Sequence, residues 1–190
     1  LMIGEDVRDQ NLQIRMIQDM IDQGVDVLIV NVINRTATVY LIRMAKEAQI
    51  PIILVNSEPL REDLFLYKDA YYIGSNAIMI GEMCGQIAVD YYLTHPDMDR
   101  NQDGTLQIIL LKGQVGHQDA EYRTRYSLLA LENAGIPVEV LAEDTAEWER
   151  DLAREKMAVE LEIYGSRIEC VICNNDQMAL GAIDALRTAG

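Results

Sequence analysis

Short apolar runs rich in β-branched residues alternate along the chain with stretches of helical periodicity. Five of these runs are almost continuously apolar, and they cover residues 25–31, 50–56, 106–113, 138–144 and 168–175. An apolar run without alternation is typical of a strand that is covered on both faces, as in a parallel sheet. A further short run at 70–76 follows a polar segment at 57–69. The pattern therefore predicts parallel strands, with residues 70–76 as the passage from one strand–helix–strand unit to a second.

The segments between the runs have the spacing of helices, with apolar residues recurring every three or four positions. These stripes consist of Ile14, Ile17, Met20 and Ile21, then Ile80, Met83, Ile87 and Tyr91, then Leu128, Leu129 and Leu131. Gly24 and Gly135 stand where two of these helices would end. Residues 147–164 and 176–189 are expected to form two more helices. The repeated order of strand and helix predicts an α/β fold made of doubly wound parallel sheets.

Both ends of the chain interrupt this order. The first residues, LMIGED, are expected to form a strand that no helix precedes. Gly190 is expected to end a helix that no strand follows. Each end therefore looks like a cut through a larger fold.

The charge of the chain narrows the class of partner. The 190 residues include 16 Lys and Arg against 31 Asp and Glu, a formal net charge of −15. Such a surface repels phosphate backbones and anionic lipid head groups, so neither nucleic acid nor a membrane surface is an expected partner. The best apolar candidate for a membrane span, residues 77–93, contains Glu82 and Asp90. The chain shows no charged-then-apolar leader, so any export signal is expected outside it.

The three cysteines, Cys84, Cys170 and Cys173, have no regular spacing that would indicate a disulfide framework. Cys170 and Cys173 form a CxxC pattern inside an expected strand. Side chains three positions apart on a strand point to opposite faces, so joint metal ligation is not expected. Buried apolar thiols are the preferred interpretation.

Polar and aromatic side chains follow several of the expected strands, where ligands bind in open parallel sheets. They are Asn56, Ser57 and Glu58, then His117, Asp119 and Arg123, then Thr145 and Trp148, then Asn174, Asn175 and Asp176. Amides, carboxylates and a guanidinium group hydrogen-bond in pairs to vicinal hydroxyls, and an indole covers the C–H side of a sugar ring. The set indicates a polyol-binding site.

Structural interpretations compete with this one. Asp119 and Asp176 could simply cap helices, and Trp148 could serve packing alone. The chain lacks the GxGxxG, P-loop and GxSxG patterns, and no nucleophile stands beside a base. These observations favour a binding protein over an enzyme.

The stretch DRNQDGTLQ at 99–107 has acidic or amide side chains at every second position. Counted from Asp99 as in an EF-hand, oxygen ligands fall at Asp99, Asn101, Asp103, Thr105 (through its carbonyl) and Gln107. Position 12 is Leu110, which lies in an expected strand and cannot ligate, and an EF-hand requires a helix there. The stretch is therefore either a calcium loop that takes a bidentate carboxylate from elsewhere or a polar turn without an ion.

These residues, in this order, resemble the galactose/glucose-binding protein family of type I periplasmic sugar receptors, the solute-binding proteins of ABC transporters. The resemblance is carried by VNSEP, AYYIGSN, DGTLQIILLKG, GHQDAEYR, EDTAEW and CNNDQMALGA, and it runs through almost the entire chain. It implies two α/β lobes joined by crossing strands, with a monosaccharide in the cleft between them. It also implies delivery of the sugar to an ABC permease, in some members signalling to a chemoreceptor, and a place in the periplasm or on the outer face of the cell envelope.

Carried over by position, the resemblance implies roles for individual residues. Galactose or glucose would be hydrogen-bonded by Asn56, His117, Asp119, Arg123 and Asn175, and Trp148 would stack on one sugar face. A structural calcium ion would be held by Asp99, Asn101, Asp103, Thr105, Gln107 and, as the distant bidentate carboxylate, Glu169. The remaining sugar contacts of the family would precede Leu1 or follow Gly190, so the sugar set is incomplete and the calcium set complete.

The resemblance also divides the chain into an N-terminal lobe at 1–75, lacking its first strand and helix, and an incomplete C-terminal lobe at 76–190. An N-terminal lobe without its first strand leaves a buried strand unpaired, so we expect poor stability or self-association of this chain in isolation. The alternative function is a sugar-binding domain of related fold in a sensor or transcription regulator. The calcium loop disfavours that alternative, because free calcium in the cytosol is low.

Overall fold

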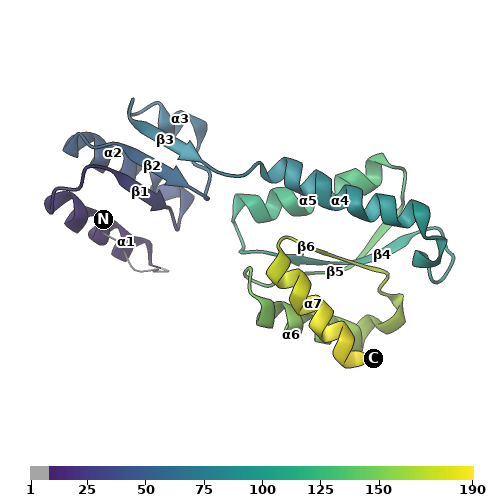
Figure 1. Ribbon diagram of the computed structural model, residues 1–190. Helices are drawn as coiled ribbons and strands as arrows, with labels where there is room; N and C mark the ends of the chain where they lie inside the picture. Colours follow the sequence, from purple (N-terminus) through teal and green to yellow (C-terminus); the bar gives the residue numbers. More distant parts are fainter. Residues whose placement is uncertain (1–8) are drawn as a thin grey trace. The chain divides into compact units, whose positions relative to one another are not determined.

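The computed structural model describes residues 9–190, so the strand expected at residues 1–6 lies outside the described part. The chain divides into two compact units, Leu1–Ser75 and Asn76–Gly190, here called unit 1 and unit 2. Each unit contains a parallel sheet with helices packed against it, which confirms the α/β class (Figure 1). Within residues 9–190, no helix is both long and apolar enough to cross a membrane.

Unit 1 is an alternating series of helices and strands. Its described elements are α1 (Gln10–Asp22), β1 (Leu28–Asn31), η1 (Arg35–Ala37), α2 (Thr38–Ala48), β2 (Ile52–Val55), α3 (Arg61–Leu64) and β3 (Ala70–Ile73). The strands pair in the order β1-β2-β3, all parallel, and the run at 70–76 supplies the last strand. The core of the unit includes Leu28, Leu41, Ile42, Ile52 and Leu54.

The sheet of unit 1 carries its core on one face. Leu28 and Val30 of β1 are buried, whereas Ile29 between them is 66% exposed. Leu41 of α2 and Ile17 of α1 join the cluster on the Leu28 side. The expectation that continuous apolar runs are covered on both faces is therefore wrong for β1 in the described structure, because the helices that pack there serve only one face.

Unit 2 has a three-layer arrangement. Its elements are α4 (Ala77–Thr94), η2 (Pro96–Met98), β4 (Leu106–Lys112), α5 (Gln118–Asn133), β5 (Val138–Thr145), α6 (Arg150–Tyr164), η3 (Gly165–Arg167), β6 (Cys170–Cys173) and α7 (Asp176–Ala189). The strands are parallel in the order β5-β4-β6. In Figure 1, α4 and α5 lie on one side of this sheet and α6 and α7 on the other.

The central strand β4 is covered on both faces, as its unbroken apolar sequence predicts. Ile108 and Leu110 belong to the cluster that includes Val89 of α4 and Leu131 of α5. Ile109 and Leu111 belong to the cluster on the other face, with residues of α6 and α7 such as Met157 and Met178. All the residues from Leu106 to Leu111 are buried.

Helix α4 forms where periodicity predicts it, but most of the predicted apolar stripe does not face the core. Met83, Ile87 and Tyr91 are 59%, 71% and 53% exposed. The buried face consists of small residues, and a side chain at Gly81 or Gly85 would collide with the backbone of α5. The two helices approach closely because this face has little side-chain volume.

The cysteines are partly buried thiols, somewhat more exposed than the buried thiols that the sequence predicts. Cys170 packs against the cluster on the α4–α5 side of the sheet and Cys173 against the cluster on the α6–α7 side, so the two side chains point to opposite faces. Burial raises the pKa of each thiol to about 12. Both therefore stay protonated at neutral pH and are poor nucleophiles.

Candidate sugar-binding and calcium sites

Five of the six sugar residues predicted from the sequence lie beyond the carboxyl ends of the strands of unit 2. Because the strands are parallel, these ends meet at one edge of the sheet. His117, Asp119 and Arg123 follow β4, Trp148 follows β5, and Asn175 follows β6. Contacts between these residues join them into one cluster.

An ion pair forms the centre of the cluster. Arg123 Nη2 donates to Asp119 Oδ2 at 2.9 Å, across one turn of α5. Asp119 is only 5% exposed, so its carboxylate requires this partner. Asp119 does not cap α5; the N-cap is His117, and Asp119 lies in the first turn, where the helix dipole favours a negative charge. The capping interpretation of Asp119 is therefore wrong.

Trp148 lies beside this ion pair on a strained loop. Glu147 and Trp148 have φ values of 49° and 67°, a left-handed conformation that is costly for residues with a Cβ atom. The indole packs directly over Gly113, where any side chain would collide with the ring. The guanidinium carbon of Arg123 is 5.7 Å from the ring centroid, and the His117 ring meets the indole edge-on at 5.3 Å.

The protonation of His117 follows from its contacts. Nδ1 accepts a hydrogen bond from the backbone N–H of Asp119 at 3.2 Å. Burial lowers the pKa of His117, and the nearby Arg123 adds to this, although Asp119 opposes it. The ring is therefore neutral at pH 7 with its proton on Nε2, which makes Nε2–H a donor for a hydroxyl group.

Asn175 has a structural role at the start of α7. Its Oδ1 accepts from the backbone N–H of Met178 at 2.9 Å, so Asn175 is the N-cap in place of Asp176. Its Nδ2 donates to the carbonyl oxygen of Trp148 at 3.1 Å. This second bond ties the loop that carries the indole to the end of β6.

The structure adds a residue whose contacts the sequence did not reveal. Asn174 is 6% exposed and bonds to three residues of the cluster, Gly113 after β4 and Thr124 and Arg123 on α5. In the sequence it stands among the polar residues after β6, but nothing there separates its role from that of Asn175. Only the distances assign the two neighbouring asparagines different partners.

The sixth predicted sugar residue, Asn56, lies in unit 1 just after β2. It has a φ of 64°, and its Nδ2 donates to Asn31 Oδ1 at 3.4 Å. Its carbonyl oxygen accepts from the Tyr72 hydroxyl at 3.0 Å. Within unit 1, the ends of β1, β2 and β3 thus carry a small polar group of their own.

The loop at 99–107 folds around its own polar side chains. Asp99 accepts hydrogen bonds from the backbone N–H groups of Asp103 and Gly104, at 3.2 and 2.9 Å. Asp103 accepts from Thr105 N–H at 2.8 Å, and this bond is the main cause that lowers the pKa of Asp103. Gly104 has a φ of 76°, which favours glycine at this turn.

Glu169 joins this loop from a distant part of the sequence. Its Oε1 accepts from Arg100 N–H at 2.6 Å and its Oε2 from Gln107 N–H at 3.1 Å, so both carboxylate oxygens are turned into the loop. All six residues of the predicted calcium set are thus gathered at the amino end of β4. Within residues 9–190, no three histidine, cysteine or acidic side chains are arranged to hold a metal on their own. Amide and main-chain oxygens would therefore have to complete a cation site, and hard oxygen donors of this kind are the ones that suit calcium.

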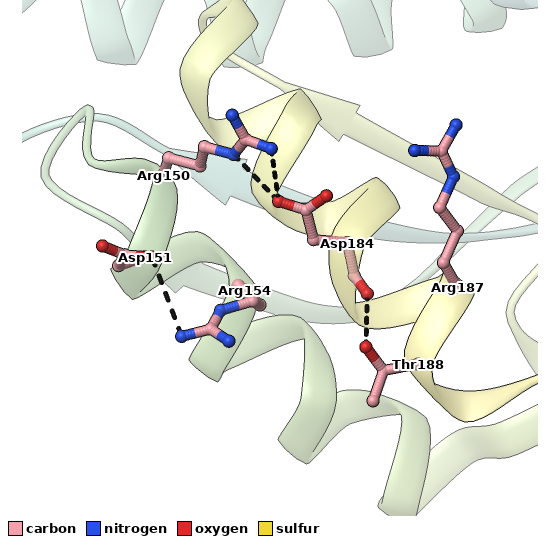
Figure 2. Close-up of a pocket in the computed structure, with 6 residues that line it drawn as sticks. All are labelled: Arg150, Asp151, Arg154, Asp184, Arg187 and Thr188. Carbon is pink, nitrogen blue, oxygen red and sulfur yellow. Dashed lines mark hydrogen bonds and ion pairs between the residues drawn. The ribbon is translucent and has the colours of Figure 1, made fainter.

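A separate groove of about 550 Å³ lies between α6 and α7 (Figure 2). It is lined by Arg150, Asp151, Arg154, Asp184, Arg187 and Thr188. Arg150 pairs with Asp184 at 2.7 Å across the two helices, and Arg154 lies 3.7 Å from Asp151. The lining has no aromatic side chain and four of its charged groups pair with each other, so it does not have the character of a sugar site.

Comparison with known proteins identifies relatives of the whole chain. A family model described as a periplasmic binding protein domain matches residues 2–190. The D-galactose/methyl-galactoside binding periplasmic protein MglB of Haemophilus influenzae is 34% identical over 191 aligned positions, which cover 100% of this chain and 58% of that protein.

Solved structures share the fold. An ABC transporter solute binding protein from Bacillus halodurans with bound myo-inositol matches with a TM-score of 0.79 and 29% identity, over 96% of this chain and 58% of that one. The binding protein of the arabinose ABC transporter from Shewanella sp. ANA-3, bound to L-arabinofuranose, matches with a TM-score of 0.81 and 28% identity, over 96% and 56%. The chain spans less than two thirds of the length of these proteins, which are described as binding proteins and not as enzymes.

Proposed function

The chain belongs to the family of periplasmic binding protein domains, and from this premise we propose that the intact protein is an extracytoplasmic sugar-binding protein that delivers its ligand to an ABC transporter. The observation that carries the proposal is the cluster at the carboxyl edge of the unit 2 sheet. There a buried Asp–Arg pair, a neutral histidine and the strained Trp148 lie within contact of one another. Trp148 also packs against the core cluster on the α6–α7 side of the sheet, whereas the polar members of the cluster lie outside the apolar core.

The residues would divide the recognition of a sugar between them. Asp119 supplies acceptors and Arg123 donors, and paired donors and acceptors discriminate between orientations of vicinal hydroxyls. Nε2–H of His117 would donate to a further hydroxyl. Trp148 would cover the apolar C–H face of the ring. The contacts predicted for Asn56 and Asn175 remain predictions, and that of Asn175 would have to coexist with its two structural hydrogen bonds.

We propose galactose or glucose as the ligand, with galactose first. The relative MglB is described as binding D-galactose and methyl-galactosides. The two solved relatives hold myo-inositol and L-arabinofuranose, which shows that proteins of this fold take different polyols. All these ligands present vicinal hydroxyls on a ring, the chemistry that the Asp119–Arg123 pair would recognise.

We also propose a structural calcium ion in the loop at 99–107. Asp99, Asn101, Asp103, Thr105 and Gln107 would supply oxygen ligands from the loop, and Glu169 would add its carboxylate from the residue before β6. Support comes from the position of Glu169, whose two oxygens already reach the loop from 62 and 69 residues away. Bound calcium would link the amino ends of β4 and β6 and would take no part in sugar recognition.

The proposed function is tested by calorimetric titration of the full-length protein with D-galactose, D-glucose, D-ribose and myo-inositol. We expect at least one hexose to bind with a Kd of about 1 μM or tighter, which corresponds to about 8 kcal/mol. Exposed residue variants such as Asn133→Ala at the end of α5 serve as controls and should bind equally well. If no sugar of the set binds, the proposal is wrong.

A further inference from the structure

Asn174 occupies the turn between β6 and α7 and is held at every polar atom of its side chain. Oδ1 accepts from the backbone N–H of Gly113 at 3.0 Å, and Nδ2 donates to Thr124 Oγ1 at 2.9 Å. Its own backbone N–H donates to the carbonyl of Leu111 at 3.1 Å. Because both polar atoms of its side chain already bond within the protein, Asn174 is better suited to hold other groups than to contact the sugar itself.

The main chain of the same residue determines the orientation of Arg123. The carbonyl oxygen of Asn174 accepts from Arg123 Nη1 at 3.0 Å, while Nη2 binds Asp119. Two acceptors, one on α5 itself and one on the β6–α7 turn, therefore define the plane of the guanidinium group. Thr124, the neighbour of Arg123 on α5, holds the Asn174 side chain, so the carbonyl and the guanidinium group keep a fixed separation.

Asn174 also fixes the surface on which the indole rests. The N–H that its Oδ1 accepts belongs to Gly113, the residue directly under the Trp148 ring. The following residue, Asn175, holds the carbonyl of Trp148. The guanidinium group of Arg123 lies 5.7 Å from the centroid of the Trp148 ring. The positions of both groups thus depend on the buried residue Asn174.

We propose that Asn174, through its hydrogen bonds to Thr124 and Gly113, is a positioning residue that sets the Arg123 guanidinium group in the geometry needed to bind a sugar. The inference rests on the proposed function, because it concerns the same site. An amide held by two segments, at Gly113 and at Thr124, keeps the site preorganised, so that sugar binding does not have to order it.

The test uses two substitutions of Thr124 in the full-length protein, with D-galactose as the probe or, if D-galactose does not bind the wild type, whichever of D-glucose, D-ribose and myo-inositol binds it most tightly. Thr124→Val removes the acceptor of Asn174 Nδ2 and leaves a buried donor unsatisfied, and Thr124→Ser keeps the hydroxyl. We expect sugar affinity to fall about tenfold in Thr124→Val and to be restored in Thr124→Ser. Asn174→Ala should weaken binding at least as much, and Asn133→Ala should not weaken it.

A double-mutant cycle separates positioning from general destabilisation. In an Arg123→Lys background, which lacks the planar fork, Thr124→Val should cost less than about threefold in affinity, because there is no guanidinium plane left to orient. A lower melting temperature with unchanged Kd in Thr124→Val, or the same tenfold loss in both backgrounds, would overturn the inference. Absence of any sugar binding by the wild type would instead refute the proposed function, and the inference with it.

Discussion

The two ends of the β4–β6 strand pair in unit 2 carry polar clusters that are built in different ways. At the amino end, all but one of the candidate calcium ligands lie within residues 99–107, and the side chains bond mainly to the backbone of their own loop. At the carboxyl end, the candidate sugar residues come from the segments after three strands and bond from one segment to another. One cluster is local and the other is tertiary.

The proposed calcium and sugar sites would thus lie at opposite ends of one pair of strands. The amino-end loop is largely closed upon itself, and Glu169 joins it to the start of β6. The carboxyl-end cluster places a cation, a neutral imidazole and an indole together at a strained turn, and strain of this kind gathers at functional sites. We therefore expect that the proposed calcium binding at one end and the proposed sugar binding at the other can be altered independently, and the following experiments test that independence.

The largest effect is expected from Arg123→Ala. Removing the guanidinium group leaves the buried Asp119 carboxylate without its partner at 2.9 Å, a change that typically costs about 3–5 kcal/mol. Sugar binding should be lost in calorimetric titration, while the calcium-dependent rise in melting temperature should persist. Loss of the calcium response in Arg123→Ala would show that the two ends are not independent.

Calcium removal is expected to have the next largest effect. At a free concentration 100 times its Kd, calcium should stabilise the full-length protein by about 2.7 kcal/mol and so raise its melting temperature. Chelation of calcium should reverse this rise, as measured by thermal denaturation. Glu169→Gln should abolish the rise and leave sugar affinity at 25 °C unchanged. Glu162→Gln, at an exposed position on α6, is the matched control. No rise with the wild-type protein would contradict the calcium site.

Gly113→Ala tests the support of the indole. A methyl group at this position collides with the Trp148 ring and must displace it, and such overpacking typically costs about 1–3 kcal/mol. We expect weaker sugar binding by titration and an unchanged calcium response. Gly85→Ala is the control, because it meets the backbone of α5 and should lower the melting temperature while leaving sugar affinity intact. Equal sugar affinity in Gly113→Ala and wild type would remove Trp148 from the site.

The smallest effect is a difference in pH response between the two ends. Burial depresses the folded pKa of His117 below its usual 6.5, so its contribution to stability is present above pH 6.5 and is lost as the pH falls through the folded value. A protonated Nδ1 can no longer accept the hydrogen bond from the Asp119 N–H. Sugar affinity should therefore decrease a few-fold as the pH falls through the folded pKa of His117. The pKa of Asp103 is lowered from 3.8, so this loop carboxylate keeps its charge there. His117→Gln should flatten the pH profile of sugar affinity; a profile that keeps its slope would assign the titration to another group.

Sequence periodicity predicted the strands of residues 9–190 and the helices α1, α4, α5, α6 and α7, but it assigned neither α2 nor α3. It also did not predict which surfaces these elements bury. The apolar stripe of Met83, Ile87 and Tyr91 locates α4, yet the glycine face is the buried one, because close approach to α5 requires small residues. In β1 the apolar run is continuous, but Ile29 is exposed because α1 and α2 pack on the other face. A period describes one element, whereas burial depends on what packs against it.

The sequence by itself determined the order of the elements and the oxygen positions of the loop at 99–107, because both follow from spacing along a continuous backbone. Only the tertiary structure decided that Asn174 holds Gly113, Thr124 and Arg123, that Asn175 caps α7 in place of Asp176, and that His117 caps α5 in place of Asp119. These contacts join residues up to 61 positions apart and differ by one or two positions from their alternatives. Parallel pairing of β4, β5 and β6 brings the segments together. Which of two neighbouring side chains makes a contact depends on three-dimensional distances, which the spacing of residues along the sequence does not give.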